Sequence, residues 1–185
     1  MALKTLDSVI GLHVISQDAF DVGEIEDLRY DPVTWDIVGF KVKSNKIVAS
    51  MLNAGSGKSM IMIKPDHYIV NDVILFQDAI EEARSRISAD NNNIPSLSYI
   101  SGRKIVTSDN ILLGSVDEIQ FDSDRWSVVS FKVKLDKAAC PLLGLKKGLF
   151  SKMAYGLLVR NIVSVSENVN LRLTMEELKD ELVFD

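Results

Sequence analysis

Two groups of residues in this sequence have types and spacings that could do chemistry. The first, Asn53-Ala-Gly-Ser-Gly-Lys-Ser59, contains a Gly-Lys-Ser run, and such runs can cradle phosphates on backbone N–H groups. The pattern also needs a glycine five residues before Gly57, where Leu52 stands, and a following helix, whereas Met60-Ile-Met-Ile63 predicts a strand. We therefore expect a flexible loop here and no nucleotide hydrolysis.

Carboxylates form the second group. Glu24-Ile-Glu-Asp27 and Asp117-Glu118 supply the hard oxygen ligands that Mg²⁺ or Ca²⁺ prefers. Both stretches predict strands, and successive side chains of a strand point to opposite faces, so Glu26 and Asp27 diverge. This divergence favours a solvated surface over a metal site.

Histidine and cysteine are too sparse for the common zinc and triad sites. His13 and His67 are the only histidines, and neither has a cysteine or a second histidine near it in the sequence. The single cysteine, Cys140, excludes an internal disulfide and stands among apolar residues, which predicts a buried thiol. We expect no enzyme activity, no cofactor and no metal.

A basic segment from Lys132 to Arg160 offers a different chemistry. It holds six lysines and one arginine against a single acid, Asp136. Basic side chains bind phosphates, and aromatic side chains such as Phe150 and Tyr155 can stack on bases, so the segment could bind RNA or a ribosome precursor. The alternative without a binding function is that these lysines keep strand edges soluble.

The same segment is also apolar enough to be a surface for a protein partner or for self-association. We rank a protein partner above RNA for this surface, and a small-ligand or catalytic role below both. The residues predicted to form the partner surface are Leu142, Leu143, Leu145, Lys146, Lys147, Leu149, Phe150, Lys152 and Tyr155.

The candidate segments described above must be positioned by the rest of the chain, which consists of one sequence unit that occurs twice. Shifting the chain by 91 positions (102 − 11) lays Gly11 on Gly102 without a gap. β-branched and aromatic residues between turn residues predict a hairpin of strands in each copy. The match continues through Asp18 and Asp109, Gly23 and Gly114, Asp31 and Asp122, Trp35 and Trp126, and the tetrapeptides Phe40-Lys-Val-Lys43 and Phe131-Lys-Val-Lys134.

The copies diverge after this hairpin, in residues 44–59 and 135–155, and we expect function to lie there. Beyond the divergent loops the two copies are aligned by a shift of 96 positions, which gives the second copy five extra residues (96 − 91). Helix capping boxes then follow at Asp78 to Glu81 and at Thr174 to Glu177, so each copy is predicted to end in a helix. Residues 1–10 form an apolar lead-in without an assigned role.

Composition narrows the class of protein. The chain has 185 residues, of which 46% are hydrophobic and 25% charged, as in globular proteins. Its net charge of −5 lies in residues 1–90, with nine Lys/Arg and fourteen Asp/Glu (9 − 14 = −5), whereas residues 91–185 hold twelve of each. An acidic chain argues against nucleic-acid or membrane binding over its whole surface. We find no run of about 18 apolar residues, so we expect no membrane insertion and a cytoplasmic location.

The repeated pattern resembles the PRC-barrel family. That family's small β-barrel occurs in the cytoplasmic part of the reaction-centre H subunit, in the C-terminal part of the ribosome-maturation factor RimM, and in small archaeal proteins, whose type this chain resembles. The resemblance implies tandem barrels and an adaptor or assembly role. It is carried by Gly11, Ser16, Gly23, Ile25, Asp27, Asp31 and Phe40, and by Gly102, Thr107, Gly114, Val116, Glu118, Asp122 and Phe131.

We therefore predict a mainly β fold with two short helices. Two tandem PRC-type β-barrels, each followed by a C-terminal helix, are expected to pack as a pseudo-dimer, with a homodimer as a further option. The predicted division is a first unit at 1–88, a linker at 89–97 and a second unit at 98–185. The predicted function is a non-enzymatic interaction or assembly module that binds a protein, with RNA binding through residues 132–160 as the alternative.

Overall fold

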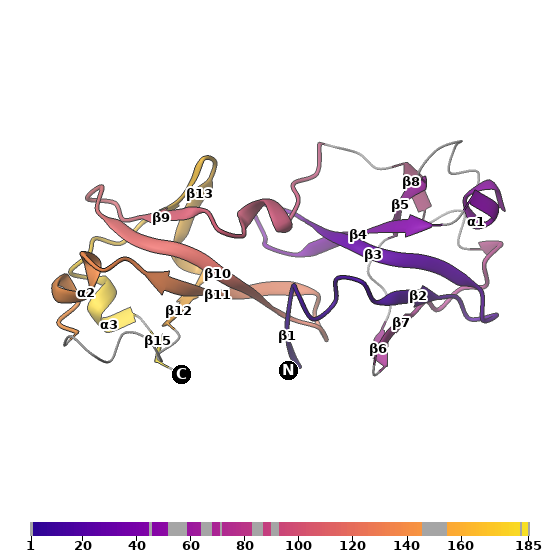
Figure 1. Ribbon diagram of the computed structural model, residues 1–185, viewed down its shortest axis with the longest axis horizontal. Helices are drawn as coiled ribbons and strands as arrows, with labels where there is room; N and C mark the ends of the chain where they lie inside the picture. Colours follow the sequence, from indigo (N-terminus) through magenta and orange to yellow (C-terminus); the bar gives the residue numbers. More distant parts are fainter. Residues whose placement is uncertain are drawn as a thin grey trace. The chain divides into compact units, whose positions relative to one another are not determined.

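The computed structural model describes residues 2–44, 46–51, 59–63, 68–70, 72–82, 87–89, 93–145, 155–181 and 183–184. In these ranges the chain is mainly β, as predicted, with two sheets and three short helices (Figure 1). The helices are α1 (Lys46–Met51), α2 (Ala139–Leu142) and α3 (Leu178–Glu181). A short strand, β1 (Leu3–Thr5), precedes both sheets in the sequence.

The first sheet runs in the order β6-β7-β2-β3-β4-β5-β8. Its strand pairs are antiparallel except β2 and β7, which are parallel. The strands are β2 (His13–Ile15), β3 (Asp21–Tyr30), β4 (Ile37–Ser44), β5 (Ser59–Ile63), β6 (Tyr68–Val70), β7 (Val73–Leu75) and β8 (Ile87–Ala89).

The second sheet repeats this topology in the order β13-β14-β9-β10-β11-β12-β15, with β9 and β14 as the parallel pair. In the part of the chain that the structure describes, neither sheet closes into a barrel, so the predicted barrels packed as a pseudo-dimer are not confirmed. The strands are β9 (Lys104–Val106), β10 (Leu112–Asp122), β11 (Ser127–Leu135), β12 (Tyr155–Leu158), β13 (Ile162–Val165), β14 (Asn168–Leu171) and β15 (Val183–Phe184).

The turns of the two copies match in detail. The N–H of Gly11 donates to the Ile25 carbonyl at 2.8 Å, and the N–H of Gly102 donates to the Val116 carbonyl at 2.9 Å. Glycine is also required further on, because a Cβ at Gly114 would collide with the backbone of β11. The matched core positions are at most 3% exposed: Val14, Ile25, Leu28, Phe40 and Val42 in the first copy, and Ile105, Val116, Ile119, Phe131 and Val133 in the second.

Strand pairing corrects the predicted shift of 96. His13 pairs with Val73, and Lys104 pairs with Asn168, so the later strands are related by 95 positions (168 − 73) while the earlier ones keep 91 (104 − 13). The second copy therefore has four extra residues (95 − 91). The predicted shift was one too many because it aligned Val73 with Val169 and the two capping boxes with each other, whereas Val73 is equivalent to Asn168 in the structure.

The two capping boxes have different outcomes. In the second copy the Glu177 N–H donates to Thr174 Oγ1 at 3.3 Å and the Thr174 N–H donates to Glu177 Oε2 at 2.8 Å, the reciprocal pair of a capping box at the start of α3. In the first copy residues 78–81 form turns, and residues 87–89 form strand β8. The helix predicted after Asp78 is therefore wrong for residues 78–81 and 87–89.

Of residues 1–10, to which the sequence assigns no role, the described residues 2–10 are the start of the first copy. At a shift of 91, Leu6 corresponds to Leu97 and Val9 to Ile100, and all four side chains are at most 3% exposed. Within the predicted linker, residue 89 ends strand β8 of the first sheet, and residues 93–97 are the start of the second copy. It docks on β3, where the Leu97 N–H donates to the Leu28 carbonyl at 2.9 Å.

Asp27 fastens this segment to β3. Its carboxylate is buried and accepts hydrogen bonds from the Ser96 hydroxyl, from the Ser98 hydroxyl at 2.7 Å and from the Ser98 N–H at 3.1 Å. A buried carboxylate is tolerated when several donors surround it. Asp27, one of the carboxylates considered above as a metal ligand, therefore has a structural role on β3.

The chain divides into two compact units, residues 1–98 with 122–127 and residues 99–121 with 128–185. The hairpin tip at 122–127 belongs to the first unit, although the repeat assigns it to the second copy. There the Trp126 ring meets the Phe40 ring edge-on with centroids 4.7 Å apart, and the Trp126 carbonyl accepts from the Ile37 N–H at 2.6 Å. The first unit is thus completed by residues of the second copy.

Candidate functional site

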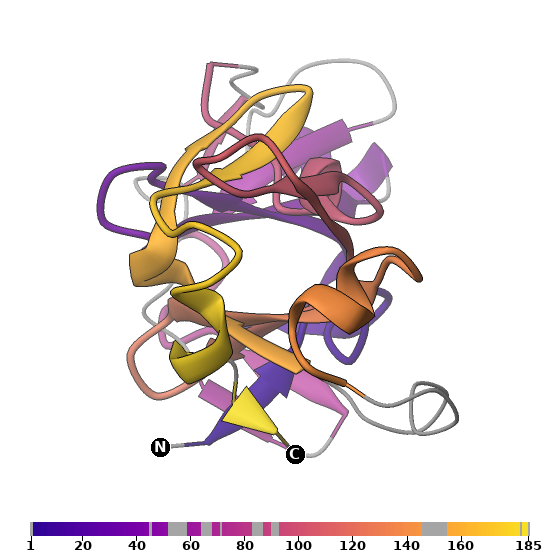
Figure 2. The same ribbon diagram turned by 90° about the vertical axis from the view of Figure 1, so that its left-hand side faces the viewer.

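The predicted partner surface begins on α2, a single helical turn in the connection between β11 and β12. Asp136 starts the turn, because its side-chain Oδ1 accepts from the Ala138 N–H at 2.8 Å and its carbonyl accepts from the Ala139 N–H at 3.1 Å. Gly144 ends it with φ +74°, a left-handed value that glycine adopts readily. Figure 2 shows α2 (orange) and α3 (yellow) as separate short helices of the second unit.

Helical spacing divides the predicted surface residues between core and solvent. Leu142 is exposed at 46%, Leu145 is half-buried, and Leu143 is 8% exposed. Tyr155, at the start of β12, is 2% exposed, and burial raises the pKa of its hydroxyl. Leu143 and Tyr155 therefore pack inside the second unit and do not face a partner. Five further predicted residues lie outside the described residues: Lys146, Lys147, Leu149, Phe150 and Lys152.

The first copy has a matching helix, α1, in the connection between β4 and β5. Its buried residues, Val48 and Ala49, correspond at a shift of 91 to Ala139 and Cys140, the buried residues of α2. The thiol of Cys140 is buried, as predicted, and donates to the Asp136 carbonyl at 3.3 Å. The copies therefore still agree through the helix, and the length difference begins after it.

The exposed side chains of the two helices differ. Ile47 of α1 is 75% exposed, whereas Leu142 is the exposed large aliphatic residue of α2. At a shift of 91, Ile47 corresponds to Ala138 and Leu142 to Met51. Each copy thus presents an aliphatic side chain from the same helix of its unit, but from a different position in that helix.

The basic segment is partly neutralised where it is described. Lys132 Nζ lies 3.1 Å from Glu118 Oε1, and Arg160 Nη2 lies 3.2 Å from Glu181 Oε2. Because Tyr155 is buried, its ring is not available to stack on a base. The predicted contribution of Tyr155 to RNA binding is therefore lost.

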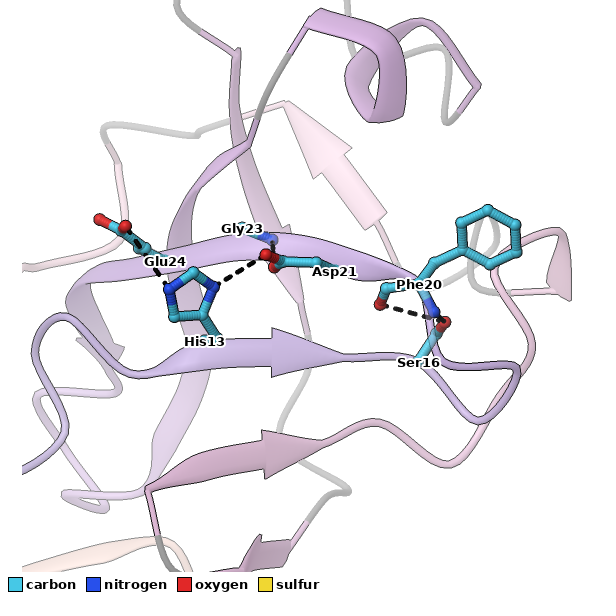
Figure 3. Close-up of polar contacts among 6 residues, drawn as sticks. All are labelled: His13, Ser16, Phe20, Asp21, Gly23 and Glu24. Atoms are coloured by element: carbon cyan, nitrogen blue, oxygen red, sulfur yellow. Dashed lines mark hydrogen bonds and ion pairs between the residues drawn. The ribbon is translucent and has the colours of Figure 1, made fainter.

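A polar cluster that the sequence did not predict lies on β2 and β3 (Figure 3). His13 Nδ1 is 2.9 Å from Asp21 Oδ2, and His13 Nε2 is 3.6 Å from Glu24 Oε1. All three side chains are about half exposed. The pairing register of β2 and β3 could have revealed this cluster, because it places Glu24 directly opposite His13.

This cluster belongs to the first copy alone. The equivalent positions in the second copy are Lys104, Leu112 and Ser115. The hydroxyl of Ser16 is not directed at His13, because it donates to Asp18 at 2.6 Å. It also accepts from the Phe20 N–H at 3.0 Å (Figure 3). Ser16 thus does not complete a triad with His13 and an acid, and among the described residues no three His, Cys, Asp or Glu side chains are placed so that they could hold a metal ion.

A surface cavity of about 330 Å³ lies beside the end of β2 in the first unit. Its lining combines apolar side chains of β7 and the residue after it with two exposed glutamines. Among its polar groups, the Ser16 hydroxyl is already bonded within the turn. The lining residues are Ser16, Gln17, Leu75, Phe76 and Gln77.

No family model matches this chain, and neither does any curated protein. Among solved structures, the chain is similar to one from Pseudomonas aeruginosa assigned to RimM, a 16S ribosomal RNA processing protein. The identity is 14%, 94% of this chain and 98% of that chain are covered, and the TM-score is 0.28. Values this low carry no argument, so the PRC-barrel resemblance rests on the repeated residues of the sequence.

One further property bears on membranes. Within the ranges that the structure describes, we find no helix with the length and apolarity that crossing a membrane requires.

Proposed function

We propose that this protein is a non-enzymatic interaction module that binds a protein partner through the exposed faces of α1 and α2. The observation that carries the proposal is the pair of exposed aliphatic side chains, Ile47 and Leu142, on helices that the same buried pair anchors in each unit. Single exposed apolar residues are common on protein surfaces. Two of them at matched places on a duplicated unit give a partner two related contacts.

The divergence of the two helices supports one partner with two different contact points. The anchoring residues keep each helix in place, while the exposed residues have changed position around the helical turn. A β-branched Ile47 in one unit and a Leu142 in the other present different shapes. Each helix is a separate contact point in its own unit, and two linked contacts raise the overall affinity beyond that of either.

The test compares the Ile47→Glu/Leu142→Glu double variant with a matched control, Val33→Glu/Val163→Glu. Val33 and Val163 are also exposed, at 85% and 67%, but lie outside both helices. Proteins that co-purify with the wild type and the control should be lost from the double variant by at least about tenfold, since a buried charge at an interface is costly. Equal recovery by all three proteins would refute the proposal.

RNA binding is the second candidate, and the observation that favours it lies at Tyr99. The ring of Tyr99 is 56% exposed, and the guanidinium carbon of Arg103 lies 3.3 Å from its centre. The neighbouring Lys104 is exposed as well. An exposed aromatic ring with a cation over it, and a lysine next in the sequence, is a combination that binds single-stranded nucleic acid.

This candidate is tested with a single-stranded RNA at several salt concentrations. The affinity should fall steeply as salt rises, because phosphate contacts release counterions. Tyr99→Ala should weaken binding by about fivefold or more, the loss expected for one stacked base. Affinity that is insensitive to salt, or unchanged in the variant, would exclude RNA binding at this place.

A further inference from the structure

Four side chains of the second unit converge where α3 meets the short 3-10 turn Val159–Asn161. Arg160 Nη2 donates to Glu181 Oε2 at 3.2 Å, and Asn161 Nδ2 donates to the same oxygen at 3.5 Å. Arg172, just after β14, donates from Nη2 to Asn161 Oδ1 at 3.3 Å. One arginine and one amide therefore donate to the carboxylate, and a second arginine holds the amide and lowers the pKa of Glu181 through its charge.

Asn161 is the fixed part of this cluster. Its side chain is almost fully buried at 1% exposure, and its backbone carbonyl accepts from the Arg172 N–H at 3.0 Å. Because the Arg172 guanidinium can only donate, it holds the Oδ1 atom of Asn161 toward itself. The Nδ2 donor must then point to the other side, where the Glu181 carboxylate lies.

The Glu181 side chain, by contrast, is loosely held. The side chains of Arg160 and Glu181 are 63% and 39% exposed, and ion pairs this open to water are weak. The hydrogen bond from Arg160 is the main reason why the pKa of Glu181 is lowered, so this carboxyl is ionised at neutral pH. Helix α3 is anchored elsewhere, through the buried Leu178 and Met175, so Glu181 can rotate away without moving the helix.

We infer that Arg160, Asn161 and Arg172 form an oxyanion-binding cradle, which Glu181 of the same chain occupies until a carboxylate or phosphate group of another molecule replaces it. The donors suit such a ligand, because guanidinium and amide N–H groups bind planar carboxylates and phosphate oxygens directionally. With Glu181 turned away, the cradle has two positive charges and no negative one. This site is separate from α1 and α2, so it stands or falls independently of the proposed function.

The test follows the Asn161 side-chain amide resonances by NMR while inorganic phosphate or acetate is added at constant ionic strength with chloride. Saturable shifts at Asn161 are expected with at least one of the two anions. Glu181→Gln, which removes the internal competitor, should raise the affinity about twofold to fivefold, because the pair it breaks is weak. Arg160→Gln should lower the affinity at least about fivefold.

Glu167→Gln is the matched control, since it removes one negative charge from the second unit outside the cradle. It should leave the affinity at the wild-type value. Tighter binding of phosphate would assign the ligand as a phosphate group, and tighter binding of acetate would assign it as a carboxylate. The inference is overturned if neither anion shifts Asn161 beyond chloride, or if Glu181→Gln and Glu167→Gln have the same effect.

Discussion

The carboxylate of Asp18 accepts a hydrogen bond from the backbone N–H of Ile80 at 3.0 Å, across 62 residues of the chain. Asp109 makes the same contact with the Met175 N–H at 3.2 Å, across 66 residues. Each carboxylate therefore connects the first turn of its copy to the segment that closes the copy. The difference of four residues (66 − 62) agrees with the strand registers.

Acid should destabilise both contacts. The pKa of Asp18 is lowered from 3.8 mainly by the Ser16 hydroxyl, and that of Asp109 mainly by the Thr107 hydroxyl. A lowered pKa in the folded state adds stability that is complete above the ordinary value and is lost as the pH falls through the folded value. We expect the urea midpoint to drop as the pH is lowered from 5 to 2.5.

Asp18→Asn and Asp109→Asn should lower the urea midpoint at pH 6 and flatten its dependence on pH, since the variants have no carboxylate to protonate there. Asp117→Asn removes an exposed carboxylate from β10 and serves as the control. A pH profile of Asp18→Asn that is as steep as that of the wild type would contradict the role given to this contact.

Gly114→Ala should destabilise the second unit by about 2 to 3 kcal/mol, the cost of overpacking a site that cannot expand. The new Cβ would strike the Lys134 carbonyl and lie 2.9 Å from Leu135 Cα. Gly102→Ala is the comparison, because its Cβ meets nothing within 4 Å and its cost comes from a φ of +75°, about 1 to 2 kcal/mol. Urea unfolding measures both, and a smaller loss at Gly114 than at Gly102 would disprove the steric argument.

Trp126→Ala should destabilise the first unit, although Trp126 belongs to the second copy. The ring is 6% exposed and packs on Phe40, and emptying such a site costs about 3 to 5 kcal/mol. Hydrogen exchange should show faster exchange in β3 and β4, with a smaller effect for Trp126→Phe. Loss of protection confined to residues 99–121 and 128–185 would show that the tip does not serve the first unit.

Asp27→Asn should cost about 2 to 3 kcal/mol, because one amide oxygen cannot accept all the hydrogen bonds that two carboxylate oxygens accept from Ser96 and Ser98. The Leu97 N–H, which is bonded to β3 beside this contact, should exchange faster. Ser98→Ala should give a smaller loss of about 1 kcal/mol. An unchanged melting temperature for Asp27→Asn would mean that the segment is held by other contacts.

Repeats and local patterns revealed much of the fold before the structure was known. Gly11 and Gly102, the strands that follow them and the Thr174 capping box all depend on residues close together in the sequence, and all are found as predicted. Alternation of apolar and polar residues along 37–43 predicts that Val38, Phe40 and Val42 share the buried face of β4. Phe40 and Val42 are buried, but a register shift beside Arg29 buries Ile37 at 2% exposure and leaves Val38 half-buried.

The candidate site was harder to predict for two physical reasons. A helix of one turn, such as α2, is too short for its periodicity to be read, so Leu143 was grouped with the exposed Leu142. Contacts between distant residues have no local signature, and both His13 with Glu24 and Arg160 with Glu181 depend on pairings that only the folded chain reveals. The divergent connections were located from the sequence, but the direction of each side chain was not.

The contribution of residues 122–127 to the first unit also has a consequence for biosynthesis. The ribosome releases the amino terminus first, yet the first unit lacks the complete tip at 122–127 until 29 residues beyond its own Ser98 have been made (127 − 98). At about 5 to 20 residues per second this takes a few seconds. During that interval Phe40 is without the Trp126 ring that packs on it, so the first unit gains its full set of core contacts only after part of the second copy has been made.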